Sequence, residues 1–88
     1  MITMTVKLEV FTSQTCPYCP MAVEVAEEAK KELGDKIDYE HYDVAEHMDL
    51  VQKYQIMSVP TIIIDGEVAF VGAPSAQELI SKLEQKIN

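Results

Sequence analysis

The chain has 88 residues with 48% hydrophobic content, and its 15 acidic and 7 basic side chains give a formal net charge of −8. This size and composition argue against disorder and predict one globular domain, residues 1–88. The negative charge disfavours nucleic acid and anionic membranes as partners, because both attract basic surfaces. It is expected to serve solubility or, as the alternative, to favour basic partner surfaces.

The first half of the chain predicts a strand, a helix, a second strand and a short helix. Apolar and charged side chains alternate over residues 4–12, which places Glu9 on the polar face of a strand. Apolar residues then recur at helical spacing, which predicts a helix over about 17–33. Residues 37–44 are expected to form the second strand and residues 46–54 the short helix.

The second half predicts a hairpin. Residues 61–64 are fully apolar or branched, and residues 67–71 return as their partner strand. Asp65-Gly66 stands between the two runs, and this dipeptide is typical of a two-residue hairpin turn.

A last helix is predicted over residues 75–87, because Ser75 and Glu78 have the S-x-x-E spacing of a capping box. The complete order is β-α-β-α-β-β-α. It predicts an α/β fold with a four-stranded mixed sheet and three helices. The first two strands are expected to run parallel, joined by a right-handed crossover, and the hairpin strands to run antiparallel.

The only two cysteines, Cys16 and Cys19, lie where the first strand gives way to the first helix. The first residues show no signal-peptide pattern, and no apolar run reaches the length of a membrane span, so a cytoplasmic protein is expected. In a reducing compartment, a C-x-x-C pair is more often catalytic or metal-binding than a structural disulfide.

Redox chemistry is the interpretation that the local pattern favours. Pro17 suits the first position of a helix, which would place Cys16 near the N-cap, where unpaired N–H groups favour a thiolate. Cys19 would then lie one turn deeper in the helix. Cys16 is therefore expected to attack a substrate disulfide, and Cys19 to resolve the mixed disulfide that forms.

Two other interpretations stay open. In the first, the C-x-x-C is half of a zinc site completed by His41 and His47, although their spacing from the cysteines is unlike that of a zinc finger. Otherwise these histidines are expected to be surface residues. In the second, the chain is an interaction domain without catalytic activity.

Several motifs together resemble a known family. The run Cys16-Pro17-Tyr18-Cys19 resembles the active site of dithiol glutaredoxins, and Val59-Pro60-Thr61 resembles the V-P-T element of the thioredoxin superfamily. Over nearly its full length the chain is similar to the small glutaredoxin-like thioredoxins of archaea. The resemblance implies a thioredoxin-like fold and thiol–disulfide exchange.

The resemblance also implies the surroundings of the cysteines. The peptide bond between Val59 and Pro60 is expected to be cis and to face the cysteines, so that the Val59 backbone pairs with a substrate strand. Pro17 and Tyr18 complete the expected substrate-binding set, and Met57 is expected at an apolar rim.

Partners follow from the same resemblance. The expected substrates are disulfide-containing proteins, and the expected electron donor is a flavoprotein of the thioredoxin-reductase type. No bound cofactor is expected, and the protein is expected to be a monomer. By analogy with some glutaredoxins, an iron–sulfur cluster shared by two chains is the alternative use of the C-x-x-C.

The chain departs from both parent patterns. Val10 stands where thioredoxins usually carry the buried Asp that accepts the proton of the second cysteine, and Thr15 replaces their usual Trp. The acceptor for Cys19 is thus open, with Glu24 as one candidate. Gly72 stands alone where glutaredoxins carry a Gly-Gly pair for glutathione, which favours a partner protein over glutathione.

Overall fold

A computed structural model describes residues 5–87 of the chain. Its elements, in chain order, are β1 (Val6–Thr12), α1 (Cys19–Leu33), the 3-10 turn η1 (Gly34–Lys36), β2 (Ile37–Asp43), α2 (Met48–Lys53), β3 (Thr61–Ile64), β4 (Glu67–Val71) and α3 (Ala76–Ile87). This order confirms the predicted β-α-β-α-β-β-α fold. Met4, which the first predicted strand included, lies outside the described residues.

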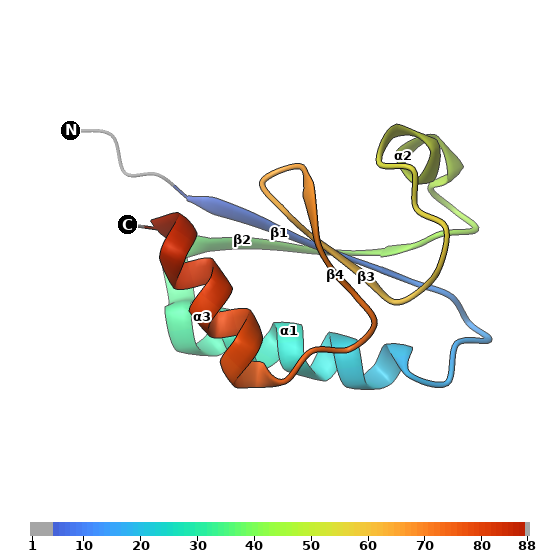
Figure 1. Ribbon diagram of the computed structural model, residues 1–88. Helices are drawn as coiled ribbons and strands as arrows, with labels where there is room; N and C mark the ends of the chain where they lie inside the picture. The colour runs from blue at the N-terminus through green and yellow to red at the C-terminus, as the bar shows by residue number, and fades with distance from the viewer. Residues whose placement is uncertain (1–4, 88) are drawn as a thin grey trace.

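The four strands form one mixed sheet in the order β2-β1-β3-β4. β1 pairs with β2 in parallel, as predicted, while β3 is antiparallel to both β1 and β4. β1 therefore lies inside the sheet with a partner on each side. Because residues 13–18 follow directly from β1, the segment that leads to the C-x-x-C pair begins at the end of an interior strand (Figure 1).

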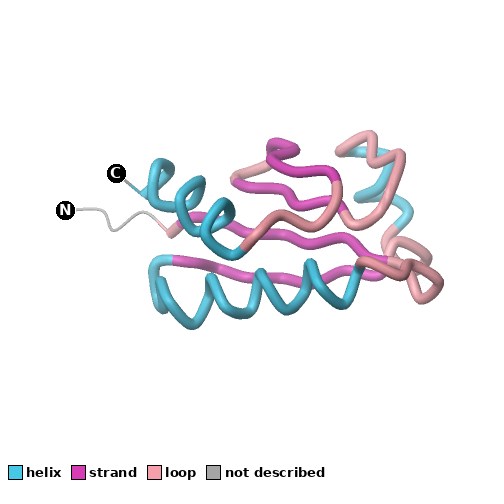
Figure 2. Tube along the Cα trace, turned by 60° about the horizontal axis from the view of Figure 1, so that its bottom comes forward, coloured by secondary structure: helices cyan, strands magenta, loops and turns pink. Residues whose placement is uncertain are grey.

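The helices cover the sheet unequally. α1 and α3 lie side by side on one face, while α2 lies on the other face near the end where β1 terminates (Figures 1 and 2). The main core fills the space between the sheet and the helix pair. Its buried members are Val6, Leu8, Val10, Ala22, Ala26, Ala29, Ile37, Ile62, Ile64, Leu79 and Leu83.

The local signals of the second half act as predicted. Asp65 and Gly66 have φ values of 52° and 84°, the left-handed conformation that a tight hairpin turn requires. At the start of α3, the Glu78 N–H donates to Ser75 Oγ at 3.2 Å, and the Ser75 N–H donates to the Glu78 carboxylate at 3.3 Å. This reciprocal pair is the expected capping box.

α1 begins later than the predicted residue 17. Its N-cap is Tyr18, and the first helical hydrogen bond runs from the Ala22 N–H to the Tyr18 carbonyl at 3.3 Å. The reason is local, because the turn closed by the Cys16 N–H and the Ser13 carbonyl is followed by a second turn at Pro17 and Tyr18. Pro20, in the first turn, is the proline that suits a helix start. Cys16 thus precedes the helix, and Cys19 is its first residue.

The face covered by α2 contains a buried carboxylate. Glu9, placed on the polar face by its alternation, is only 1% exposed and accepts a hydrogen bond from the Tyr54 hydroxyl at 3.2 Å. Beside it, the ring of Phe11 lies 5.1 Å from that of Tyr42 and 5.9 Å from that of Tyr54. The polar face of β1 is therefore a second, smaller interior.

Candidate active site

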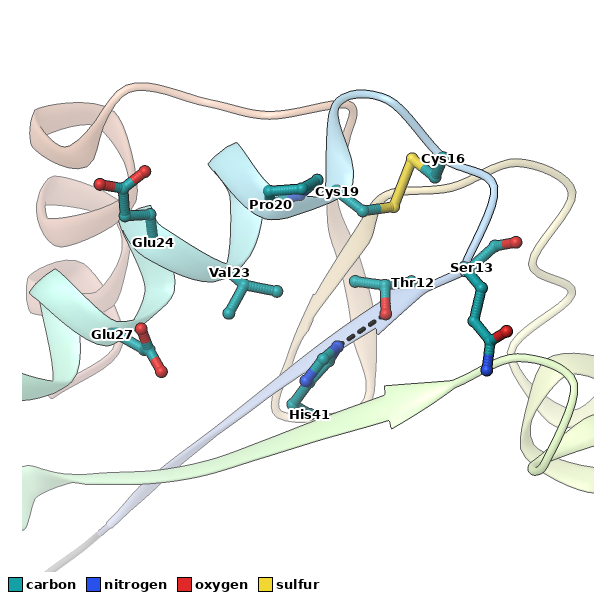
Figure 3. Close-up of a pocket in the computed structure, with 10 residues that line it drawn as sticks. Thr12, Ser13, Cys16, Cys19, Pro20, Val23, Glu24, Glu27 and His41 are labelled. Carbon is teal, nitrogen blue, oxygen red and sulfur yellow. Dashed lines mark hydrogen bonds between the residues drawn. A yellow bond between two sulfur atoms is a disulfide. The ribbon is translucent and has the colours of Figure 1, made fainter.

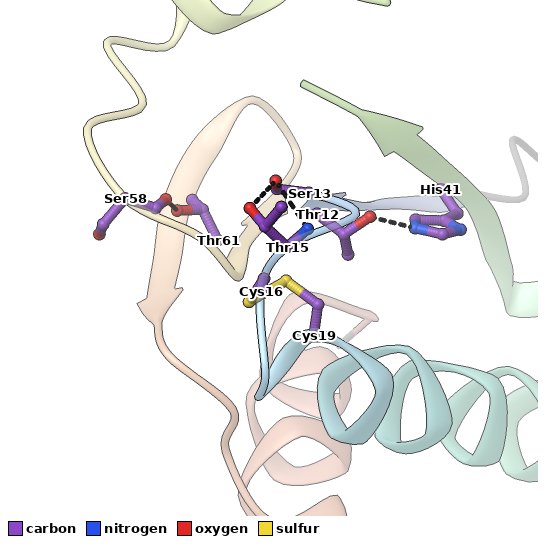
Figure 4. Close-up of a disulfide and its surroundings, with 8 residues drawn as sticks. All are labelled: Thr12, Ser13, Thr15, Cys16, Cys19, His41, Ser58 and Thr61. Atoms are coloured by element: carbon purple, nitrogen blue, oxygen red, sulfur yellow. Dashed lines mark hydrogen bonds between the residues drawn. A yellow bond between two sulfur atoms is a disulfide. The ribbon is translucent and has the colours of Figure 1, made fainter. Parts of the chain in front are cut away.

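Cys16 and Cys19 are joined by a disulfide whose Cα atoms lie 5.4 Å apart, within the usual range for such a bond (Figure 4). Cys19 is 3% exposed, since it starts α1 against the core, whereas Cys16 is partly exposed in the preceding turn. Cys16 is therefore more accessible to solvent than Cys19, and a partner molecule approaching from outside reaches Cys16 first.

Ser13 organises the turn that carries Cys16. Its carbonyl accepts the Cys16 N–H at 3.2 Å, and its hydroxyl accepts the Thr15 N–H at 3.3 Å. The hydroxyls of Ser13 and Thr15 lie 3.2 Å apart (Figure 4). Because the turn is held by its own backbone and by short polar side chains, it positions Cys16 without help from the helix.

The segment before β3 lies beside this turn (Figure 4). The Val59–Pro60 peptide bond is cis, as the resemblance implied, and Pro60 is buried. The Gly72 N–H donates to the Pro60 carbonyl at 2.8 Å, and the Thr61 hydroxyl donates to the Ser58 carbonyl at 2.6 Å. In the described part of the chain, the backbone of Val59 makes no hydrogen bond of its own.

A cleft of about 530 Å³ opens on the α1 side of the disulfide (Figure 3). Glu24 and Glu27, from the second and third turns of α1, form one side, and Thr12 and His41, from the ends of β1 and β2, form the other. The remaining lining residues are Ser13, Gln14, Cys16, Cys19, Pro20 and Val23.

Within this cleft, Thr12 Oγ1 and His41 Nε2 lie 2.6 Å apart, a short hydrogen bond (Figures 3 and 4). From the sequence, His41 is expected to be either a zinc ligand or a surface residue, with no role in proton transfer. It is exposed, but its ring reaches into the site. The available signal was the parallel pairing of the first two strands, which puts His41 beside Val10 and on the same face of the sheet.

On the α2 side of the disulfide lies a smaller, mainly apolar groove of about 260 Å³. It runs beside Val59, and Met57 at its rim is 95% exposed. Its lining residues are Ser13, Val44, Met48, Val51, Ile56, Met57, Ser58 and Val59. Tyr18, between the cysteines, is 64% exposed. Apolar surface thus borders the turn on the side of the Val59 backbone.

Only one of the two histidines, His41, lies in the cleft with the cysteines. His47 packs instead against the ring of Tyr42, with centroids 4.7 Å apart. Over residues 5–87, no three His, Cys, Asp or Glu side chains form a group suited to a metal ion. The donor set that the zinc interpretation required is therefore not assembled in the described part of the chain.

Three tyrosines have raised pKa values. Burial, and secondarily the charge of Glu27, raises the pKa of Tyr39 to about 12. Burial, followed by the charge of Glu9, also raises the pKa of Tyr42 and that of Tyr54. These hydroxyls keep their protons at neutral pH, so they do not supply the base that a thiol requires.

Comparisons with known proteins agree with this geometry. The thioredoxin domain family matches residues 5–84. A probable thioredoxin of Methanothermobacter marburgensis is 55% identical over 84 residues, covering 96% of this chain and 99% of that protein. The thioredoxin of Methanocaldococcus jannaschii is 42% identical over 82 residues, covering 93% of this chain and 96% of the relative.

Among solved structures, the thioredoxin of Malassezia sympodialis superposes with a TM-score of 0.81 and 26% identity, covering 96% of this chain and 79% of that one. The chain belongs to the thioredoxin domain family. It is a thiol–disulfide oxidoreductase with Cys16 and Cys19 as its redox couple, and disulfide-containing proteins are its general class of substrate. Within residues 5–87, no helix has the length and apolar character needed to cross a bilayer.

Proposed function

We propose that Cys16 is the attacking sulfur and Cys19 the resolving sulfur in the reduction of protein disulfides. The unequal exposure of the two sulfurs supports this order, because only Cys16 is open to a large partner. The Cys16 sulfur is bonded to Cys19, the first residue of α1, so it lies near the N-terminus of that helix. The helix dipole favours a thiolate at this position, although α1 begins later than predicted.

The exchange proceeds in two displacements. The Cys16 thiolate attacks one sulfur of the substrate disulfide, and the other substrate sulfur leaves with its electron pair as a thiolate. Cys19, having lost its proton, then attacks the Cys16 sulfur of the mixed disulfide. The Cys16–Cys19 bond forms, the second substrate thiolate leaves, and two electrons have passed from the protein to the substrate.

Pro17, Tyr18, Val59 and Pro60 form the proposed substrate-binding surface. Pro17 and Tyr18 are exposed beside Cys16. Val59, whose backbone makes no hydrogen bond in the described structure, lines one groove with Ser13 of the same turn. An extended substrate segment can pair with Val59 while its cysteine reaches Cys16, since strand addition uses such unpaired backbone groups. Pro60 is buried, and its carbonyl accepts the Gly72 N–H at 2.8 Å, which ties the segment to the end of β4.

We also propose the electron donor, the oligomeric state and the cellular location of the protein. The electron donor is a flavoprotein of the thioredoxin-reductase type, since Gly72 alone does not provide the Gly-Gly pair of glutathione-binding relatives. Residues 1–88 act as one domain, a monomer of the cytoplasm. The continuous core between the sheet and the α1–α3 pair supports one cooperative unit.

A trapping experiment tests the order of attack. Cys19→Ser retains the attacking sulfur but cannot resolve the mixed disulfide, so protein partners are expected to accumulate covalently on Cys16 in a cell extract. Cys16→Ser, the matched control, should trap no partners and should lose insulin reduction. Equal trapping by Cys16→Ser would contradict the assigned roles. Capture of glutathione alone would mean that the partner is glutathione and not a protein.

A further inference from the structure

Cys19 begins α1 in an environment with little that can take its proton. It is 3% exposed, and Val10, on the strand face beneath α1, is fully buried and apolar. Only the thiolate attacks a disulfide, and burial disfavours the charged form of a thiol. The second displacement of the proposed function therefore requires a nearby group that removes the Cys19 proton as the attack occurs.

The cleft beside the disulfide contains few candidates. From α1, Glu24 and Glu27 face it, and from β2, His41 does. On β2 itself, Tyr39 and Asp43 share the face of His41. The Tyr39 hydroxyl keeps its proton because its pKa is raised to about 12, and the Asp43 carboxylate accepts the Ala45 N–H at 2.8 Å. Neither α2 nor α3 contributes a lining residue.

Thr12 distinguishes His41 from the two glutamates. It is the last residue of β1, is 7% exposed, and lies between the disulfide and the His41 ring (Figures 3 and 4). Its hydroxyl is already hydrogen-bonded to His41 Nε2 at 2.6 Å. A hydroxyl accepts one proton while it donates another, so it can connect a buried thiol to an exposed imidazole.

We propose that Thr12 and His41 relay the proton of Cys19 to solvent during the second displacement; the proposal rests on Cys19 being the resolving sulfur. Neutral His41 accepts the Thr12 hydroxyl proton at Nε2, and Thr12 Oγ1 accepts the thiol proton of Cys19. The Cys16–Cys19 bond forms as the bond from Cys16 to the substrate sulfur breaks. The substrate leaves as a thiolate with the electron pair, and the imidazolium carries the proton.

The relay also runs in reverse. When the disulfide is reduced, an imidazolium donates its Nε2 proton to Thr12 Oγ1, and the Thr12 hydroxyl proton passes to the Cys19 sulfur. The ring of His41 is exposed, so it can exchange its proton with water. One pair of side chains thus serves both directions of exchange and compensates for the absence of an acidic residue at Val10.

Stopped-flow reaction with 5,5′-dithiobis(2-nitrobenzoate) separates the two displacements. The first coloured thiolate appears at a rate proportional to probe concentration, as Cys16 attacks. The second appears at a rate independent of probe concentration, as Cys19 resolves. We expect the second rate to fall at low pH with an inflection, because a protonated base cannot accept the Cys19 proton.

Removing either relay group should change only the second step. His41→Gln should lower the second rate at pH 7.5 by at least about tenfold and abolish its inflection. A loss of about tenfold is less than general base catalysis usually contributes. Thr12→Val should do the same, whereas Thr12→Ser, which keeps the hydroxyl, should retain the rate and the inflection. The first rate should stay within about twofold in all three variants, which also reports that the site is folded.

Matched variants decide between the candidates. His47→Gln, which alters a histidine packed on Tyr42 outside the cleft, should leave both rates unchanged. An unchanged second step in His41→Gln, or a loss of the inflection in Glu24→Gln or Glu27→Gln instead, would overturn the relay. The assignment of sulfurs fails separately, if Cys19→Ser rather than Cys16→Ser abolishes the first coloured release.

Discussion

On each face of the sheet, the polarity of the interior is opposite to the polarity of the opening beside the disulfide. Under α1 and α3 the interior is apolar, yet the cleft beside Cys19 is lined by His41, Thr12 and two glutamates. Under α2 the interior holds the buried carboxylate of Glu9, yet the groove beside Val59 is mainly apolar. Ser13 lines both openings and marks the boundary between them.

This contrast separates two tasks of an exchange enzyme. Proton transfer requires polar groups at fixed positions, and the cleft places them on the ends of two paired strands beside a rigid helix. Substrate binding requires adaptable apolar contact, and methionine side chains such as Met57 provide it. The difference predicts that changes on the cleft side alter the rate of resolution, whereas changes on the groove side alter the affinity for protein substrates.

The largest effect on stability is expected inside the α2 face. Tyr54→Phe removes the hydroxyl that donates to buried Glu9 and should lower the free energy of unfolding by about 1–3 kcal/mol, because a buried carboxylate loses a partner. Urea unfolding of the oxidised protein measures it. Tyr42→Phe is the matched control, since it alters a neighbouring ring for which the described structure shows no hydroxyl hydrogen bond. Equal losses in both variants would mean that the hydrogen bond to Glu9 does not contribute to stability.

A smaller effect is expected on the α1 face, at high pH. The folded-state pKa of Tyr39 is about 12, above the ordinary value of 10.0. Ionisation of Tyr39 therefore leaves stability unchanged below about pH 10, and stability is lost as pH rises toward 12, because the unfolded state ionises first. The loss should reach at most about 2 kcal/mol, because the side chain is only partly buried.

Tyr39→Phe isolates this loss of stability at high pH. Its buried hydroxyl has no hydrogen-bond partner in the described structure, so the variant should be at least as stable as the parent at pH 8. Unfolding at pH 11.5 should then show the variant gaining stability relative to the parent. Tyr18→Phe, at an exposed ring, should show no such gain. A parallel decline of the parent and Tyr39→Phe with pH would contradict the assignment.

Features encoded by neighbouring residues could be predicted from the sequence. The Asp65-Gly66 turn, the Ser75 capping box and the C-x-x-C pair each depend on a few adjacent side chains, and the structure confirms all three. The start of α1 was misplaced by two residues, because both Pro17 and Pro20 suit a helix start and only the turn formed by Ser13 selects between them.

Features created by pairing between distant segments could not be predicted in the same way. The Thr12–His41 contact joins residues 29 positions apart and exists only because the parallel register of β1 and β2 brings their ends together. The burial of Glu9 depends on α2 and Tyr54 covering a face that alternation alone marks as polar. Both features are polar groups on apparently exposed positions, and periodicity carries no information about what covers them.

The smallest effect is expected at the groove, where it sharpens the contrast between recognition and proton transfer. Met57→Ser removes an apolar side chain beside the Val59 backbone and should raise KM for insulin about three- to tenfold, the loss of about 1 kcal/mol of apolar contact, with kcat unchanged. Both rates with the small aromatic probe should stay unchanged. Met21→Ser, at an exposed methionine of α1 outside the groove, is the control. A similar rise in KM for both variants would show that apolar contact surrounds the cysteines evenly rather than on the α2 side.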